Sequence, residues 1–416
     1  MAGADIQMDR TDIGATFNAG APLTRLREVA ADPSAYVTEW KRQSGRRVLG
    51  VLPMNLPLEI VDACGALPVI IQETREPITV GNTLLVEFNC GYTRNLADQA
   101  GLQRMGGYDG FVFADHCIQL FGAADVIRAF YPDKPLFFSQ LISAMGDPWS
   151  FGEAKRSLET LVAELSEFVG RAVTPDDLRR SIAARNENRR LQREIFAARR
   201  EGRIWVTASD LQAIVKSSMV MDVREHTALL RRLHLAAAPL VQDGSRVKVH
   251  LSGHFCHAPQ VELLDLIEDA GGLVVDDDLY HGFRFISTDA PEDIEPIDAL
   301  TRWYLDRNTA VPCPTRVQND VDWDGYLLRA TQRSGAEAII VLMAKFCEPH
   351  MLYYPELRRG LDAHEVPHLL LETEHEGVPE ETIRTRLEAL FERVHRKRSA
   401  PARSAAQLTP NLSPIA

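Results

Sequence analysis

The sequence lacks the short motifs that mark several large groups of nucleotide-binding and metal-binding proteins. It has no GxxxxGK[ST] phosphate loop, and no predicted strand is followed by GxGxxG, so neither a P-loop ATPase nor a dinucleotide-binding domain is indicated. Gly-x-Ser-x-Gly is missing, which argues against an α/β-hydrolase. No CxxC pair occurs, which excludes zinc-ribbon and ferredoxin spacings. If ATP drives the chemistry of this protein, another polypeptide must hydrolyse it.

Long apolar runs and a surplus of positive charge are also missing. No window approaches the ~20 apolar residues of a membrane span. Residues Met1 to Pro22 contain no apolar core flanked by basic residues, so we expect no signal peptide, no membrane partner and a cytoplasmic location. The formal net charge of −12 argues against a nucleic-acid partner, which would require a basic face. A length of 416 residues with 45% hydrophobic residues is typical of a soluble protein of two or three domains.

Strands and helices alternate in the first half of the chain. The predicted elements are the strand Val48–Leu52, the helix Leu58–Cys64 and the strands Leu67–Ile71, Gly110–Asp115 and Pro135–Phe138. Pro53 and Pro57 bracket the turn into the helix, and Gly65 closes it. This order is a βαβ unit with a right-handed crossover, so it predicts a parallel sheet.

The second half repeats this order after a helical stretch. A strand at Arg246–Gly253, a turn containing Pro259, a helix at Val261–Asp269 and a strand at Leu273–Asp276 match the first unit. Between the halves, Gly152 to Leu240 is rich in Arg, Glu and Ala, and its charges are predicted to form a solvated helical face.

We therefore predict an α/β fold of two similar domains, each with a parallel sheet flanked by helices, plus a helical segment between them. The predicted parts are a helical lead-in at 1–45, a first α/β domain at 46–150, a helical region at 151–242, a second α/β domain at 243–396 and a disordered tail at 397–416.

Cysteines follow the predicted strands of both halves. The apolar run Ala338–Ala344 reads as a buried strand and leads to Cys347, just as Gly110–Asp115 leads to Cys117. Ligands of α/β sheets bind beyond the carboxyl ends of the strands, so these thiols are predicted to face one cleft, with Cys90 beside Cys117. Three thiolates can hold a metal cluster and leave one iron open. The alternative is that each thiol only packs in the core.

Histidines and carboxylates near the strand ends offer other chemistry. Five histidines near the predicted strand ends are candidate ligands of a His–metal site, namely His116, His254, His257, His281 and His350. Asp276, Asp277 and Asp278 follow a buried strand and either bind a cation or form an exposed acidic turn. Glu348 and His350 flank Cys347 and are the favoured proton-transfer residues.

Several segments together resemble the iron–sulfur subunits of the 2-hydroxyacyl-CoA dehydratase and benzoyl-CoA reductase family. Lys345–His350 is similar to the family's Lys-Phe-Cys-Asp-Pro segment, and Tyr354-Pro355 and Val366–Glu372 are similar to the Tyr-Pro pair and the strand that follow it. Supporting matches are Leu58–Pro68, Ala270–Gly272 and Asp277–Arg284. The resemblance spans about residues 46–396.

The resemblance implies that Cys90, Cys117 and Cys347 bind one [4Fe-4S] cluster whose fourth iron is left for a small ligand or the substrate thioester oxygen. It also implies an acyl-CoA substrate, a related subunit as partner in a heterodimer or a second copy in a homodimer, and a separate ATP-hydrolysing iron–sulfur activator. The activity would be the reversible dehydration of a 2-hydroxyacyl-CoA or the reduction of an aroyl-CoA such as benzoyl-CoA.

Two alternatives to this activity stay open from the sequence. One is a homodimeric reductase of small molecules with a fused cluster, and the other is a cluster-free, two-domain binding protein. Where many relatives have Pro-Tyr after the first cysteine, this chain has Gly91-Tyr92, so Cys256 is kept as an alternative third ligand in place of Cys90.

Overall fold

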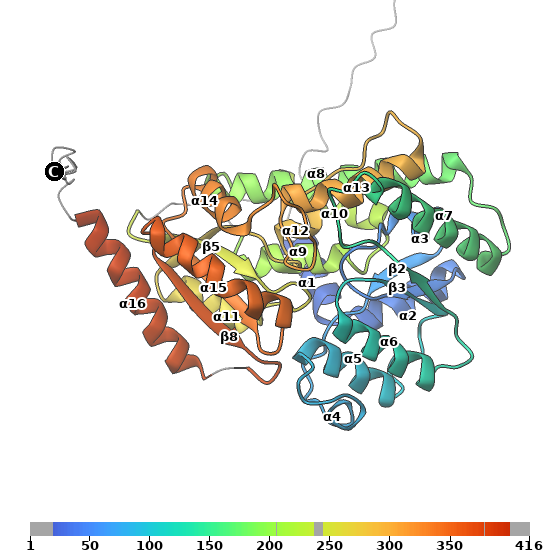
Figure 1. Ribbon diagram of the computed structural model, residues 1–416, viewed down its shortest axis with the longest axis horizontal. Helices are drawn as coiled ribbons and strands as arrows, with labels where there is room; N and C mark the ends of the chain where they lie inside the picture. Colours follow the sequence, from blue (N-terminus) through green and yellow to red (C-terminus); the bar gives the residue numbers. More distant parts are fainter. Residues whose placement is uncertain (1–19, 205, 237–243, 378, 400–416) are drawn as a thin grey trace, which may run out of the picture.

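The protein contains two four-stranded parallel sheets, each flanked by helices, which confirms the predicted fold class. The structure is a computed structural model that describes residues 20–204, 206–236, 244–377 and 379–399. In Figure 1 the first sheet lies to the right and the second to the left, and helix α8 (Pro175–Arg200) runs along the side shared by both. Within these ranges, no helix combines the length and the apolar character that crossing a membrane requires.

The first sheet has the strand order β2-β1-β3-β4. Its strands are β1 (Val48–Val51), β2 (Leu67–Ile70), β3 (Gly110–Ala114) and β4 (Leu136–Ser139). Its helices are α3 (Glu59–Ala63), α4 (Gly81–Leu84), α5 (Gly91–Gly101) and α6 (Ile118–Phe130). All residues of β1, β2 and β3 are buried, as expected for parallel strands covered on both faces.

The second sheet has the equivalent order, β6-β5-β7-β8. Its strands are β5 (Val247–Gly253), β6 (Gly272–Asp277), β7 (Ala338–Ala344) and β8 (His368–Thr373). Its helices are α11 (Val261–Asp269), α12 (Phe283–Ile286), α13 (Pro296–Ala310), α14 (Trp323–Ser334), α15 (Glu348–Ala363) and α16 (Glu380–Ser399). The repetition of one order in both sheets supports the predicted similarity of the two halves.

In each sheet the strand order reverses next to the first strand, between β1 and β3 and between β5 and β7. Loops on either side of such a switch point turn in opposite directions and leave a crevice at the carboxyl ends of the strands. Cys117 follows β3 and Cys347 follows β7 at these switch points, whereas Cys90 lies between α4 and α5.

Helices also precede the first sheet and connect the two sheets. They are α1 (Gly20–Ala31), α2 (Pro33–Ser44), α7 (Ser150–Val169), α9 (Ala208–Ser218) and α10 (Val223–Ala236). The domain boundaries at residues 45, 150 and 242 stay a prediction. Residues 397–399 belong to α16, and the rest of the predicted tail lies outside the described residues.

The prediction that the charges of the helical region form a solvated face holds for only one side of α8, where Arg179, Arg180 and Arg190 are exposed. Arg185 and Arg189 are buried and pair with Asp62 (2.6 Å) and Glu59 (2.8 Å) near the first sheet. Arg199, also on α8, is buried against Glu268 of the second unit. Buried arginines need such partners because an unpaired charge in the interior is costly. Helix α8 therefore ties the two α/β units together through charge.

A buried histidine in β5 is expected to make the folded protein less stable as the pH rises into the alkaline range. His250 has no exposed surface, and its Nδ1 lies 3.3 Å from Oδ2 of Asp276. Burial lowers the pKa of His250, but hydrogen bonding to Asp276 and Asp278 and their charges outweigh it and raise the pKa to about 9. The stabilisation is fully present below the unfolded pKa of about 6.5 and is lost as the pH rises through about 9.

The measurement is urea unfolding at a series of pH values from 6 to 10 for the wild type and His250→Gln. The wild type is expected to lose on the order of 3 kcal/mol more than the variant across this range, since one pKa unit corresponds to about 1.4 kcal/mol. Parallel pH profiles for the two proteins would contradict the assignment.

Candidate functional site

Three cysteines from different parts of the chain occupy the same position relative to a helix. Cys90, Cys117 and Cys347 are the N-cap residues of α5, α6 and α15. All three line one cavity of about 250 Å³ between the two sheets, together with Cys256 from the loop after β5. The structure thus brings the three predicted thiols together, and it adds the one kept as an alternative.

The three helix N-termini carry positive electrostatic potential into this cavity. Each end leaves backbone N–H groups without intrahelical acceptors, and it favours a nearby negative charge by about 0.3–1 kcal/mol. None of the three cysteine side chains makes a capping hydrogen bond to its helix. A thiolate at a helix N-terminus is stabilised in the same way as other anions, which suits a metal-binding thiol.

Without a metal, burial makes ionisation of most of these thiols unfavourable. Burial raises the pKa of Cys117 to about 12, and the neighbouring Cys90 adds to the increase. The pKa of Cys347 rises for the same two reasons. Burial raises the pKa of Cys256 well above its usual value, and the thiols of Cys117, Cys90 and Cys347 raise it further. The sulfurs are therefore close enough to repel one another as thiolates, and a cation between them would remove that repulsion.

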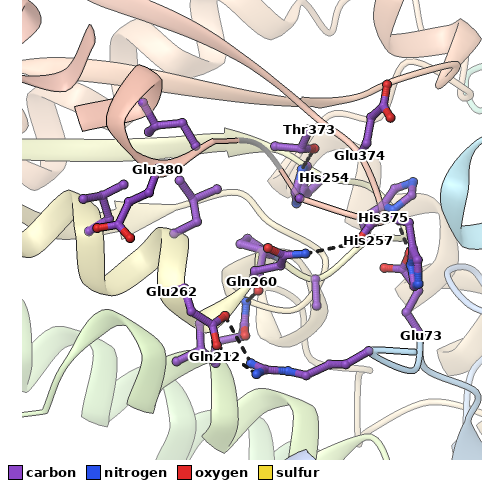
Figure 2. Close-up of a pocket in the computed structure, with 18 of the residues that line it drawn as sticks. Glu73, Gln212, His254, His257, Gln260, Glu262, Thr373, Glu374, His375 and Glu380 are labelled. Atoms are coloured by element: carbon purple, nitrogen blue, oxygen red, sulfur yellow. Dashed lines mark hydrogen bonds and ion pairs between the residues drawn. The ribbon is translucent and has the colours of Figure 1, made fainter. Parts of the chain in front are cut away.

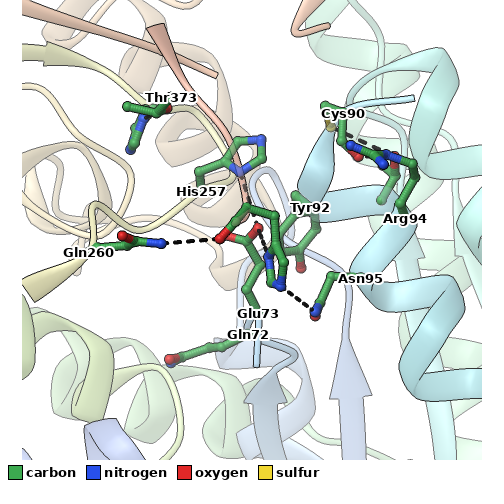
Figure 3. Close-up of polar contacts among 12 residues, drawn as sticks. Gln72, Glu73, Cys90, Tyr92, Arg94, Asn95, His257, Gln260 and Thr373 are labelled. Carbon is green, nitrogen blue, oxygen red and sulfur yellow. Dashed lines mark hydrogen bonds and ion pairs between the residues drawn. The ribbon is translucent and has the colours of Figure 1, made fainter. Parts of the chain in front are cut away.

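Cys90 differs from the other thiols because a histidine lies beside it. Burial raises the pKa of Cys90, but the interaction with His257 and hydrogen bonds from Thr93 lower it below the usual value. Nδ1 of His257 lies 3.2 Å from Oε1 of Glu73 (Figure 3). Glu73 also contacts His375. Nε2 of His257 is buried without a hydrogen-bond partner. Glu73 thus orients His257 and favours its charged form next to the Cys90 sulfur.

One glutamine side chain holds the three cysteine segments together. Oε1 of Gln119 accepts a hydrogen bond from the backbone N–H of Cys90 at 2.8 Å. Its Nε2 donates to the backbone oxygens of Phe346 at 2.9 Å and Phe88 at 3.4 Å. Since Gln119 follows Cys117 in α6, its amide joins the loops of all three thiols. No sequence motif marked this residue.

The loops that end three central strands contain residues in the left-handed region. Met54 after β1, His254 after β5 and Phe346 after β7 have φ values of 89°, 44° and 63°. Such conformations cost on the order of 1–3 kcal/mol each for residues other than glycine, and they gather at functional sites. Phe346 directly precedes Cys347, so the sharp turn there sets the direction of the thiol.

The two predicted proton-transfer residues occupy different environments. Glu348 lines the cavity and is exposed. His350 has no exposed surface, and it packs against Phe255 and Trp323 with ring centroids 5.2 and 5.1 Å away. Neither ring nitrogen of His350 has a hydrogen-bond partner, and burial lowers its pKa to about 4. A proton-transfer role stays a prediction for both, with Glu348 the better placed.

Three of the other predicted histidines line one or both of two cavities. His116 and His257 line the thiol cavity. His254 and His257 line a second cavity of about 340 Å³ on the side of α9 and α11 (Figure 2). His281 lines neither of these two, and its Nδ1 lies 3.0 Å from the backbone oxygen of His257. His257 is thus shared by both cavities.

The acidic run at the end of β6 is not an exposed turn. Asp276, Asp277 and Asp278 are all buried. Asp278 accepts hydrogen bonds from Ser252 and from the backbone N–H of Gly253, at 2.7 and 2.8 Å. Asp277 accepts from the backbone N–H groups of Leu279 and Phe283, and burial raises its pKa to about 7. The run fixes the loops after β5 and β6.

The donor set of the thiol cavity fits an iron–sulfur cluster better than a single ion. Within the described ranges, no three His, Cys, Asp or Glu side chains could hold one metal ion. A polynuclear cluster binds each thiolate at a different iron, so its ligands stand apart around a cavity. Cys90, Cys117 and Cys347 do so, and Cys256 offers a fourth sulfur.

Comparison with known proteins gives a consistent family. Residues 53–394 match the family model described as 2-hydroxyglutaryl-CoA dehydratase, D-component. The chain is 26% identical to a benzoyl-CoA reductase subunit of Thauera aromatica, over 80% of this chain and 86% of that protein. It is 28% identical to the lactoyl-CoA dehydratase subunit beta of Anaerotignum propionicum, over 89% of this chain and 98% of that protein. It is also 24% identical to the (R)-phenyllactyl-CoA dehydratase beta subunit of Clostridium sporogenes, over 88% of this chain and 97% of that protein. The chain therefore belongs to the 2-hydroxyglutaryl-CoA dehydratase D-component family.

Proposed function

We propose that this chain is the iron–sulfur subunit of an ATP-activated enzyme that acts on CoA thioesters. The observation that carries the proposal is the convergence of three helix-capping cysteines, from both sheets, on one cavity. Cys90, Cys117 and Cys347 would hold a [4Fe-4S] cluster, which supplies one-electron transfer at low potential when bound. Membership of a family with both dehydratase and reductase subunits supports an acyl-CoA or aroyl-CoA substrate.

The surroundings of the cavity suit this chemistry. Its lining is mainly apolar, with Tyr92, Leu120 and Phe255 among the thiols, so it limits contact with water. A low dielectric strengthens the interaction between a bound anionic centre and the three helix N-termini. Charged His257 lies next to Cys90 and stabilises negative charge on its sulfur. Glu348, exposed at the cavity, is the residue we assign to proton exchange with a substrate or partner.

Exposed apolar side chains near the cysteine loops support a partner subunit. Phe88, Ile118 and Leu352 are 64%, 73% and 82% exposed. Phe88 precedes Cys90, Ile118 follows Cys117, and Leu352 lies near the start of α15. Apolar side chains gathered on a surface are typical of an interface. We assign this surface to a related subunit in a heterodimer, or to a second copy, with a separate ATP-hydrolysing iron–sulfur activator as electron donor.

The proposal predicts about four irons and four acid-labile sulfides per chain after anaerobic purification. With the co-purified partner, ATP, the activator and a strong reductant, turnover is expected for one class in a panel of 2-hydroxyacyl-CoA and aroyl-CoA esters. Water loss without net reduction identifies a dehydratase, and ring reduction identifies a reductase. A chain that holds no iron and takes none up on reconstitution would contradict the proposal and favour the cluster-free binding protein instead. About twice the iron would instead favour the fused-cluster reductase.

A further inference from the structure

The thiol cavity contains a fourth sulfur that a three-cysteine site does not use. Cys256 lies in the loop between β5 and α11 and is 8% exposed. It lines the same cavity as Cys90, Cys117 and Cys347. Its thiol is free, and no hydrogen bond to its Sγ occurs within the described residues. The sulfur therefore faces the place where the proposed cluster would sit, without another partner.

The loop that carries Cys256 is fixed at several points. At Gly253 φ is 107°, and a β-carbon there would lie 2.3 Å from the backbone oxygen of Leu342, so only glycine fits. Three backbone oxygens of the loop are hydrogen-bonded to other segments. The oxygen of His254 accepts from the backbone N–H of Tyr280 (3.3 Å), and that of Pro259 accepts from Nε2 of Gln212 (2.8 Å). The oxygen of His257 lies 3.0 Å from Nδ1 of His281. These contacts hold the thiol in place.

The other polar groups of the cavity are less suited to bind the fourth iron. Nδ1 of His116 lies 3.3–3.4 Å from Thr315 and Asn55. Glu348 is exposed at the cavity edge. The nearest competitor is His257, whose Nε2 is buried without a hydrogen bond. Its Nδ1 lies 3.2 Å from Oε1 of Glu73, and its ring also lines the second cavity, so its variant is tested beside that of Cys256.

We infer that Cys256 is the fourth ligand, so that the cluster is bound by four thiolates and this chain relays electrons to its partner. The inference rests on the proposed function, and it differs from the open iron that the family resemblance implied. A closed cluster accepts one electron from the activator and passes one on, and no bond is made or broken at its irons. The thioester oxygen has no free iron in this chain, so the substrate reacts on the partner subunit.

The test compares the anaerobically purified wild type with Cys256→Ala, His257→Gln and the matched control Cys313→Ala. Cys313 is another buried thiol of this region, but it does not line the thiol cavity. Each protein is treated with ferricyanide, which removes an iron that lacks a cysteine ligand. Iron per chain and the EPR signal of a three-iron cluster are then measured.

We expect the wild type and Cys313→Ala to keep all four irons, and Cys256→Ala to lose one of four and give the three-iron signal. A wild type that gives this signal as strongly as Cys256→Ala would overturn the inference. Opening of the cluster by His257→Gln and not by Cys256→Ala would also overturn it and assign His257 instead.

A second measurement avoids the need for a folded variant. Cyanide added to the reduced wild type binds an open iron and shifts its EPR spectrum, so an unchanged spectrum supports four thiolate ligands and a shifted one contradicts them. Absence of iron from the wild type and from every variant would refute the proposed function itself, and the inference with it.

Discussion

Cys347→Ser is expected to remove most of the iron from the anaerobically purified chain, whereas Cys64→Ser leaves the iron content unchanged. Cys347 lines the thiol cavity at the N-terminus of α15. Cys64 is equally a buried cysteine, but it ends α3 in the first unit and does not line that cavity. The pair therefore separates loss of a ligand from loss of a buried thiol.

The size of the effect follows from the chemistry of the ligand. A serine oxygen is a harder and more basic donor than a thiolate, and iron–sulfur clusters are held by soft thiolates. Burial also opposes ionisation of a hydroxyl more strongly than of a thiol at this position. Iron and acid-labile sulfide per chain are the measurements, with far-UV circular dichroism as the folding control. Equal iron loss in the two variants would contradict the ligand assignment.

The strands and the cysteine cavity could be predicted because both depend on local patterns. The run Ala338–Ala344 is apolar throughout, and the structure has β7 over the same residues. Parallel strands end at one edge, so thiols that follow β3 and β7 were expected near each other. The same rule applied to Cys256, which follows β5, and the structure places it in that cavity too.

The contacts that fix this cavity were not predictable from the same patterns. The burial of Arg189 and Arg199 depends on Glu59 and Glu268, which are remote in sequence. A charged helical stretch looks the same whether its face meets water or another unit. The roles of the histidines were equally hard to predict, since His257 lines the thiol cavity while His350, three residues after the predicted ligand Cys347, packs in the core. Side-chain partners between distant segments are set by the tertiary fold.

Gln119 is the clearest case of such a contact, and its loss is expected to weaken the cluster site without unfolding the protein. Its amide bonds the backbone of Cys90 and Phe346 while its own helix carries Cys117. Gln119→Leu keeps the volume and removes both bonds. At about 1 kcal/mol for each bond, the variant loses roughly 2 kcal/mol of the free energy that holds the thiol loops in their relative positions. This corresponds to a roughly 30-fold faster loss of iron to a chelator.

Gln119→Glu tests separately the hydrogen bonds that the Gln119 amide donates. A carboxylate still accepts the N–H of Cys90, but it repels the backbone oxygens of Phe346 and Phe88 and places a negative charge beside the thiolates. Iron release is therefore expected to be at least as fast as in Gln119→Leu. The matched control is Gln103→Leu, because Gln103 donates only a 3.4 Å bond to Phe130 at the surface. Chelator-dependent iron release and thermal unfolding of the apo chain are measured together. Similar release rates for the wild type and Gln119→Leu would mean that the three cysteine loops hold their positions without this amide.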